Sequence, residues 1–133
     1  MRTKACLTND DCKKIATAAF TEANKNKWAV TVAIVDDGGH LLYLEKMDAA
    51  NALSAEIATK KARTAALTGR PSRMWEERIK EGRLAMLSMP VLPVQGGMPI
   101  LVDGDRVGGV GVSGVQSHED EQIASVGIAA VVK

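Results

Sequence analysis

Aromatic residues are scarce in this sequence. They make up 3% of the 133 residues and consist of Phe20, Trp28, Tyr43 and Trp75. Proteins that bind single-stranded nucleic acid usually stack bases on aromatic side chains, and this chain has little to offer as such a platform. A hydrophobic core must therefore be built mainly from Ala, Val, Ile, Leu and Met, and the many small residues favour helices that lie close to a sheet or to a neighbouring subunit.

An excess of either charge is also missing. The sequence has 17 Lys and Arg against 16 Asp and Glu, which gives a net charge of +1, and no block of like charges stands out. Binding to a phosphate backbone requires a basic face. The charge balance therefore predicts that the chain binds neither nucleic acid nor an anionic membrane surface.

Long hydrophobic runs and paired cysteines are absent as well. No segment approaches the roughly 20 apolar residues of a membrane span, and the N-terminal segment lacks the apolar region of a secretory signal. Cys6 and Cys12 form no C-x-x-C motif, which is typical of two reduced thiols in a cytosolic protein. We therefore expect a cytoplasmic protein.

The residues that are present predict a single α+β domain over residues 1–133. Hydrophobic residues make up 46% of the chain, enough for one core at this length. In chain order the patterns predict a helix at 9–25, a hairpin of strands 28–36 and 40–47, a helix at 54–68, a short helix at 72–80, a hairpin of strands 98–102 and 106–113, and a closing helix at 118–130. Hairpins combined with helices predict an antiparallel sheet flanked by helices.

Two polar segments mark helix starts. Thr8 precedes Asp10 and Asp11, which place negative charge at the positive end of the first helix. The run from Ser117 to Asp120 matches a capping box for the closing helix. We expect both helices to begin at these positions.

Residues 109–114 read GVGVSG, which matches the G-x-G-x-x-G fingerprint of dinucleotide-binding folds. That fingerprint requires a βαβ unit with an acidic residue at the end of the next strand. Only 19 residues follow Gly114, and the closing helix uses them. We therefore reject a nucleotide site and expect that the glycines let an alanine-rich helix, a second subunit or a flat ligand approach the strand.

Four sequence blocks together resemble the GlcG/HbpS-like family, which includes the C-terminal domain of PduO-type corrinoid adenosyltransferases. The blocks are VAIVDDGGHLLYLEKMDAA, SAEIATKKARTAAL, GGMPILVDGDRVGGVGVSG and the downstream DEQIA. The resemblance implies a profilin-like or roadblock-like sandwich and homo-oligomers. It also implies haem binding in some members, a role with a sensor kinase in one group, and catabolic gene clusters in others.

We also expect a ligand site, for which the resemblance implies that Asp48 and Lys61 lie near the turn at Gly96 and Gly97. It would be lined by Met47, Asp48, Lys61, Thr64, Gly96, Gly97, Pro99, Ser113 and His118. Lys61 would bind a carboxylate such as a haem propionate, or would form a structural pair with Asp48. His118 would ligate the haem iron or transfer protons; a methionine such as Met47 or a weak oxygen ligand is the alternative at the iron.

Three functions stay open at this point. The first is a homo-oligomeric protein that binds a small ligand, with haem as the named cofactor and an accessory or sensor role. The second is a lyase or isomerase acting on a small organic acid, with Lys61, Asp48 and His118 as catalytic residues. The third is a structural assembly subunit. Whether the chain is an enzyme is not determined by its sequence.

Overall fold

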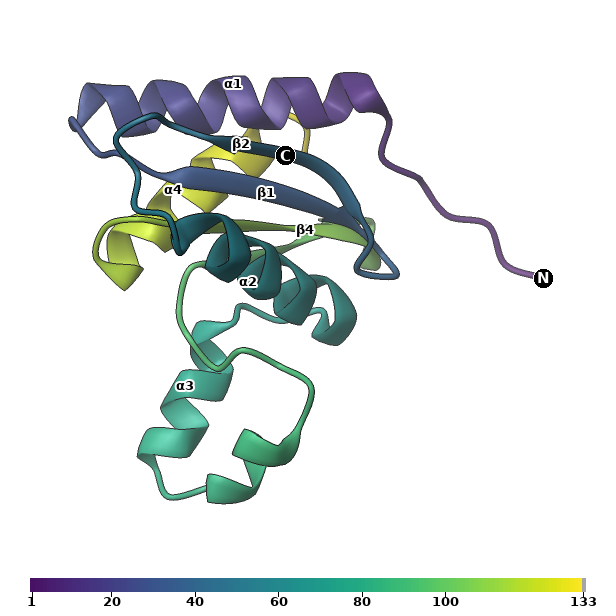
Figure 1. The fold of residues 1–133 in the computed structure, drawn as a ribbon. Coiled ribbons are helices and arrows are strands. Elements are labelled where there is room, and N and C mark those ends of the chain that lie inside the picture. The colour runs from purple at the N-terminus through teal and green to yellow at the C-terminus, as the bar shows by residue number, and fades with distance from the viewer. Residues whose placement is uncertain (133) are drawn as a thin grey trace.

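The predicted order of helices and strands is confirmed. We describe residues 1–132 in a computed structural model (Figure 1). The elements are α1 (Asn9–Lys25), β1 (Thr31–Asp36), β2 (Leu41–Lys46), α2 (Ser54–Thr68), α3 (Arg73–Lys80), a 3₁₀ helix η1 (Leu84–Ser88), β3 (Gly97–Val102), β4 (Asp105–Ser113) and α4 (Ser117–Ala129). The 3₁₀ helix lies between the predicted short helix at 72–80 and the predicted strand at 98–102, where no helix was predicted.

The four strands form one antiparallel sheet in the order β2-β1-β4-β3. Helix α2 covers one face, and helices α1 and α4 cover the other (Figure 1). The α+β class, with an antiparallel sheet between helices, is therefore confirmed. The centre of the sheet is β1 and β4, so β2 and β3 are the edge strands.

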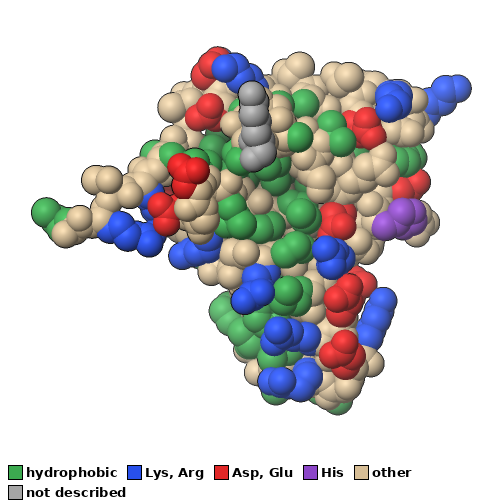
Figure 2. Space-filling view, turned by 180° about the vertical axis from the view of Figure 1, so that it is seen from behind, with side chains coloured by type: hydrophobic (Ala, Val, Ile, Leu, Met, Phe, Trp, Pro, Cys, Tyr) green, Lys and Arg blue, Asp and Glu red, His purple; other side chains and the backbone are tan. Residues whose placement is uncertain are grey.

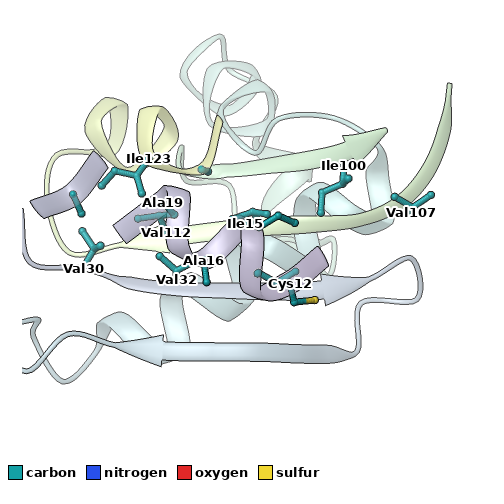
Figure 3. Close-up of a cluster of buried hydrophobic side chains, with 14 residues drawn as sticks. Cys12, Ile15, Ala16, Ala19, Val30, Val32, Ile100, Val107, Val112 and Ile123 are labelled. Carbon is teal, nitrogen blue, oxygen red and sulfur yellow. The ribbon is translucent and has the colours of Figure 1, made fainter. Parts of the chain in front are cut away.

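The larger core lies between the sheet and the α1–α4 pair (Figure 3). Val32 and Ile34 of β1 and the preceding Val30 belong to this core. Ile15 of α1 and Ile123 of α4 pack in the same core. The smaller core consists of Ala33 and Val35 of β1 and three alanines of α2, namely Ala58, Ala62 and Ala66. The alanines explain the close approach of α2, because only small side chains separate this helix from the sheet.

The glycines of the G-x-G-x-x-G segment lie in the interior of β4, against the backbone of α2. A Cβ atom at Gly111 would overlap the carbonyl oxygen of Ala58, and one at Gly109 would lie 2.5 Å from that of Ala62. Helix contact is thus the reason for these two glycines, as one of the sequence alternatives proposed. The antiparallel neighbours of β4 exclude the βαβ unit that a dinucleotide site requires.

One of the two predicted helix caps is wrong. Thr8 caps α1 in a reciprocal capping box with Asp11, as the sequence indicated. At α4, however, the capping box joins Gln116 to Glu119, one residue earlier than predicted. Asp120 is thereby free for another role. The first strand begins at Thr31 instead of residue 28. A turn with φ of +59° at Lys27 precedes it.

Residues 70–95, which we call the arm, extend from the body of the domain and contain α3 and η1 (Figure 1). Helix α3 has no fully buried residue. Figure 2 shows side chains of both charges and hydrophobic side chains together on this part of the molecule. The arm returns to the body at Gly97, where the backbone N–H of Ser72 donates to the Gly97 carbonyl.

Candidate functional site

A cavity of about 300 Å³ lies between α2 and the end of the arm. Its lining consists of Lys60, Arg63, Thr64, Pro90, Val91 and Leu92. Helix α2 contributes two cationic side chains and one hydroxyl, and the arm contributes an apolar wall. A cavity of this size is at the lower end of the range for small-molecule sites.

Hydrogen bonds at Thr64 fix the two walls against each other. The backbone N–H of Leu92 donates to the Thr64 hydroxyl at 2.8 Å, and this hydroxyl donates to the Lys60 carbonyl at 2.9 Å. Arg63 donates one guanidinium N–H to the Gly39 carbonyl at 3.0 Å. Both cations are exposed, so their remaining donors can reach a ligand.

The electrostatic character of the cavity follows from its lining. Lys60 approaches Glu56 only at 3.8 Å, on the exposed side of the helix, and such a surface pair contributes little. No Asp, Glu or His is among the lining residues. The cavity therefore suits an anionic group attached to an apolar body.

Lys61, which the sequence placed in the ligand site, forms a buried ion pair instead. Its ammonium donates to the Asp120 carboxylate at 3.0 Å and to the Val112 carbonyl at 3.0 Å. The side chains of Lys61 and Asp120 are 3% and 2% exposed. The other Asp120 oxygen accepts the backbone N–H of Val115 at 3.2 Å. A ligand carboxylate could reach this ammonium only by displacing Asp120.

The alternative pairing of Lys61 with Asp48 is wrong. Asp48 follows β2 and is exposed, whereas Lys61 lies over β4 and β3, on the other side of β1 in the sheet. Asp120 belongs to α4, on the face opposite α2, so the Lys61 side chain joins the two helical layers. It does so beside Gly96, where a Cβ atom would lie 2.7 Å from the ammonium nitrogen.

Burial raises the pKa of Asp120 above its ordinary value, and the neighbouring Lys61 ammonium and the Val115 N–H oppose that rise. Burial dominates because the carboxylate has lost nearly all contact with water. Burying both charges carries a large desolvation cost. Three hydrogen bonds of Lys61 and Asp120 offset this cost and fix the position of the pair.

The structure distributes the predicted site residues over several places. Lys61, Gly96 and Gly97 lie together, since a Cβ atom at Gly97 would overlap the Lys61 carbonyl oxygen. Thr64 lies one helical turn further along and lines the cavity. These four residues form the part of the predicted set that surrounds the contact between α2 and the start of β3.

The remaining predicted residues do not line this cavity. Met47 packs against the main core, and its sulfur accepts the backbone N–H of Val30 at 3.4 Å. Pro99 lies within β3, and Ser113 ends β4 with 9% exposure. His118 is exposed in the first turn of α4. The residues described contain no group of three His, Cys, Asp or Glu side chains that could hold a metal ion.

Sequence reasoning missed Asp120 and the two cations of the cavity. The sequence pattern assigns Asp120 to a capping box, and no local pattern sets Lys60 and Arg63 apart from other surface charges. A signal for the cavity wall did exist, since Pro90 to Leu92 belong to the uncharged, largely apolar run of residues 84–94, which follows the charged residues of α3. No signal in the sequence indicated that Lys61 would meet a residue 59 positions away.

The comparisons with known proteins agree with this fold. The family model described as "Haem degrading protein HbpS-like" matches residues 7–129. Protein GlcG of Escherichia coli (strain K12) is 45% identical over 114 residues, which is 85% of each chain. The crystal structure of a Streptomyces reticuli HbpS double mutant is 30% identical, with a TM-score of 0.91, and covers 100% of this chain and 92% of its own.

A further solved structure is described as a complex of PduOC with haem. It is 30% identical to this chain, has a TM-score of 0.87, and the alignment covers 96% of both chains. None of the described helices is both long enough and apolar enough to cross a membrane.

Proposed function

Because the chain belongs to the HbpS-like family, we propose that it binds a small ligand with carboxylate groups on an apolar body, and that haem is this ligand. The observation that carries the proposal is the cavity beside α2, where Lys60 and Arg63 lie next to the apolar wall of the arm. A family relative described in complex with haem supports the choice of ligand.

The lining residues fit two parts of a haem molecule. Its propionates are anionic, and exposed Lys and Arg side chains bind such groups through charge-assisted hydrogen bonds. The edge of its macrocycle is apolar and suits Pro90, Val91 and Leu92. When bound, haem would bring an iron centre that can take part in redox chemistry.

The fit to the iron is weaker. His, Cys, Met and Tyr are the usual axial ligands, and none of them lines the cavity. The Thr64 hydroxyl is the only side-chain oxygen among the lining residues, and it is buried and already bonded to Leu92 and Lys60, so the lining offers no free ligand for the iron. His118 remains the proposed nitrogen ligand only if a second copy of the chain or another binding position brings it to the iron.

The enzyme alternative has less support. Its three proposed residues differ in their surroundings: Lys61 is buried and bonded to Asp120, whereas Asp48 and His118 are exposed. No Asp, Glu or His side chain lines the cavity to transfer a proton to its ligand. We therefore propose an accessory or sensor role in the cytoplasm for a self-associating binding protein, in place of a lyase or isomerase.

Titration of the purified protein with haem, followed by Soret absorbance, tests the proposal. The double variant Lys60→Ala/Arg63→Ala should weaken binding roughly tenfold or more, because two charge-assisted contacts are lost. Lys14→Ala/Lys25→Ala removes the same charge from exposed positions on α1 and should bind haem as the unmodified protein does. Equal affinity in both double variants would place the ligand elsewhere, and no Soret change at all would exclude haem.

Two further titrations separate the iron from the carboxylates. His118→Ala should change the Soret band only if His118 is an iron ligand. Metal-free protoporphyrin carries the same propionates, so it should compete with haem if the cations supply most of the affinity. Failure of protoporphyrin to compete would show that the iron dominates binding.

A further inference from the structure

The outer edge of β2 has no partner strand among residues 1–132 of a single chain. In the sheet order β2-β1-β4-β3, β2 is an edge strand, and five of its six residues are exposed. Leu41, Leu42 and Leu44 expose 51%, 38% and 38% of their surface. A strand edge that combines free amide groups with exposed leucines favours pairing with another strand.

The register of β2 shows which amide groups are free. The backbone N–H of Met47 donates to Val30 of the β1 side, and in an antiparallel pair the residues that face the partner alternate along the strand. The backbone N–H and C=O groups of Glu45 and Tyr43 therefore face β1. Those of Leu44 and Lys46 point outward from the free edge of the sheet. These groups are available to a second strand.

The opposite edge is closed to such pairing. Strand β3 contains Pro99, which has no N–H to donate. At its start, the backbone N–H of Ser72 donates to the Gly97 carbonyl, and the Ser72 hydroxyl accepts the Gly97 N–H. The two edges thus differ: β3 is blocked by proline and by the arm, and β2 has neither protection.

We propose that β2 pairs with β2 of a second copy of this chain, antiparallel about a two-fold axis at Leu44, so that two sheets become one continuous sheet. A strand is complementary to itself in this arrangement, because each free N–H of one copy meets a free C=O of the other. A two-fold axis perpendicular to the sheet also keeps α2 of both copies on the same side.

The side chains favour Leu44 as the centre. Leu44 then lies opposite itself, Leu42 lies opposite the aliphatic stem of Lys46, and Tyr43 lies opposite Glu45, so no like charges meet. Centring the pair on Glu45 would place two carboxylates against each other. Centring it on Tyr43 would use the stretch where the β1–β2 register shifts, between the partners of Ile34 and Val35.

This inference gives the self-association proposed above a defined surface, and it does not depend on haem binding. The lining of the haem cavity contains no residue of β2. The protein can therefore fail to bind haem and still pair through β2, or bind haem without pairing. The two proposals are tested separately.

Disulfide cross-linking tests the two-fold centre. In a Cys6→Ser background, which removes the exposed native thiol, Leu44→Cys should give a covalent dimer under mild oxidation, since opposed Cα atoms lie about 5.5 Å apart. Leu53→Cys, at a leucine 60% exposed outside β2, should stay largely unlinked. A dimer formed through Tyr43→Cys but not Leu44→Cys would overturn the proposed register, and equal linking by the Leu53→Cys variant would overturn specific pairing.

Sedimentation of the haem-free protein tests the interface itself. Leu44→Lys should reduce the assembly mass at a protein concentration where the unmodified chain is a dimer or a multiple of one. An unmodified chain that sediments as a monomer, or a Leu44→Lys variant with unchanged mass, would overturn the proposal. Because Leu44 is partly exposed, the Leu44→Lys variant should fold, and far-UV circular dichroism checks this. The Leu44→Cys variant is the second test, since it keeps a small apolar side chain at the same position.

Discussion

Removal of one partner of the Lys61–Asp120 pair should destabilise the fold more than any surface substitution. Asp120→Asn preserves the size of the side chain but leaves the Lys61 ammonium, 3% exposed, without its counter-charge. Breaking a buried pair in this way costs about 3–5 kcal/mol, because one charge stays buried without compensation. Domains of this size have a total stability of about 5–15 kcal/mol, so the loss is a large share of it.

The expected shift is large enough to measure by thermal unfolding. For a chain of this length each kcal/mol corresponds to roughly 3–5 °C in Tm, so Asp120→Asn should lower Tm by roughly 10–20 °C. The double variant Lys61→Met/Asp120→Leu should recover most of that loss, since apolar residues of similar volume remove both desolvation costs. The exposed neighbour provides the control: Lys60→Met should change stability by about 0.5 kcal/mol or less.

The pH dependence of Lys61→Met separates the charge from the packing. Burial already raises the pKa of Asp120, and loss of the ammonium should raise it further. Between the unfolded pKa, near about 4, and the raised folded pKa, the native state binds more protons than the unfolded state. The stability of Lys61→Met should therefore fall as the pH rises through that window.

Urea unfolding at several pH values measures this slope. Asp120→Asn, which cannot titrate at this position, should lack it. The reasoning is refuted if Asp120→Asn costs less than about 1 kcal/mol, or if the double variant is no more stable than the single ones.

Three further outcomes follow from the fold. Gly111→Ala should destabilise the protein by about 3 kcal/mol or more in urea unfolding, because the added Cβ would overlap the Ala58 carbonyl, whereas Gly38→Ala in a surface turn serves as the mild control. Thr8→Ala should cost about 1 kcal/mol through the lost N-cap of α1, and an unchanged Tm would contradict this. The Thr8 N–H and hydroxyl donate to the Asp11 carboxylate and lower its pKa. At neutral pH the unmodified protein should therefore be more stable than Asp11→Asn. This difference in stability should disappear as the pH falls below about 4 and the carboxylate is protonated.

Local pattern was sufficient for the elements of this fold. The bounds of α1 and its Thr8 cap depend on residues a few positions apart, and the structure confirms both. The sequence also led us to reject a nucleotide site, and the antiparallel neighbours of β4 agree with that rejection. Family resemblance added the expectation of a profilin-like or roadblock-like sandwich.

The candidate site required more than local pattern. Short-range rules assign Asp120 to a helix cap, because a capping box is defined within four residues, and they cannot show that a carboxylate on one layer meets Lys61 from the other. The same limit applies to Lys60 and Arg63. They line a cavity only because the arm folds back and places Pro90 to Leu92 opposite them.

The sequence by itself determined the class of the fold, the order of its helices and strands, and the need for glycine in β4. The tertiary structure alone decided that Lys61 is a structural residue, that two neighbouring cations face a cavity, and that β2 has a free edge. The physical reason is that each of these features depends on which segments pack together. The burial of a side chain, the walls of a cavity and the unpaired edge of a sheet are defined only in the folded chain.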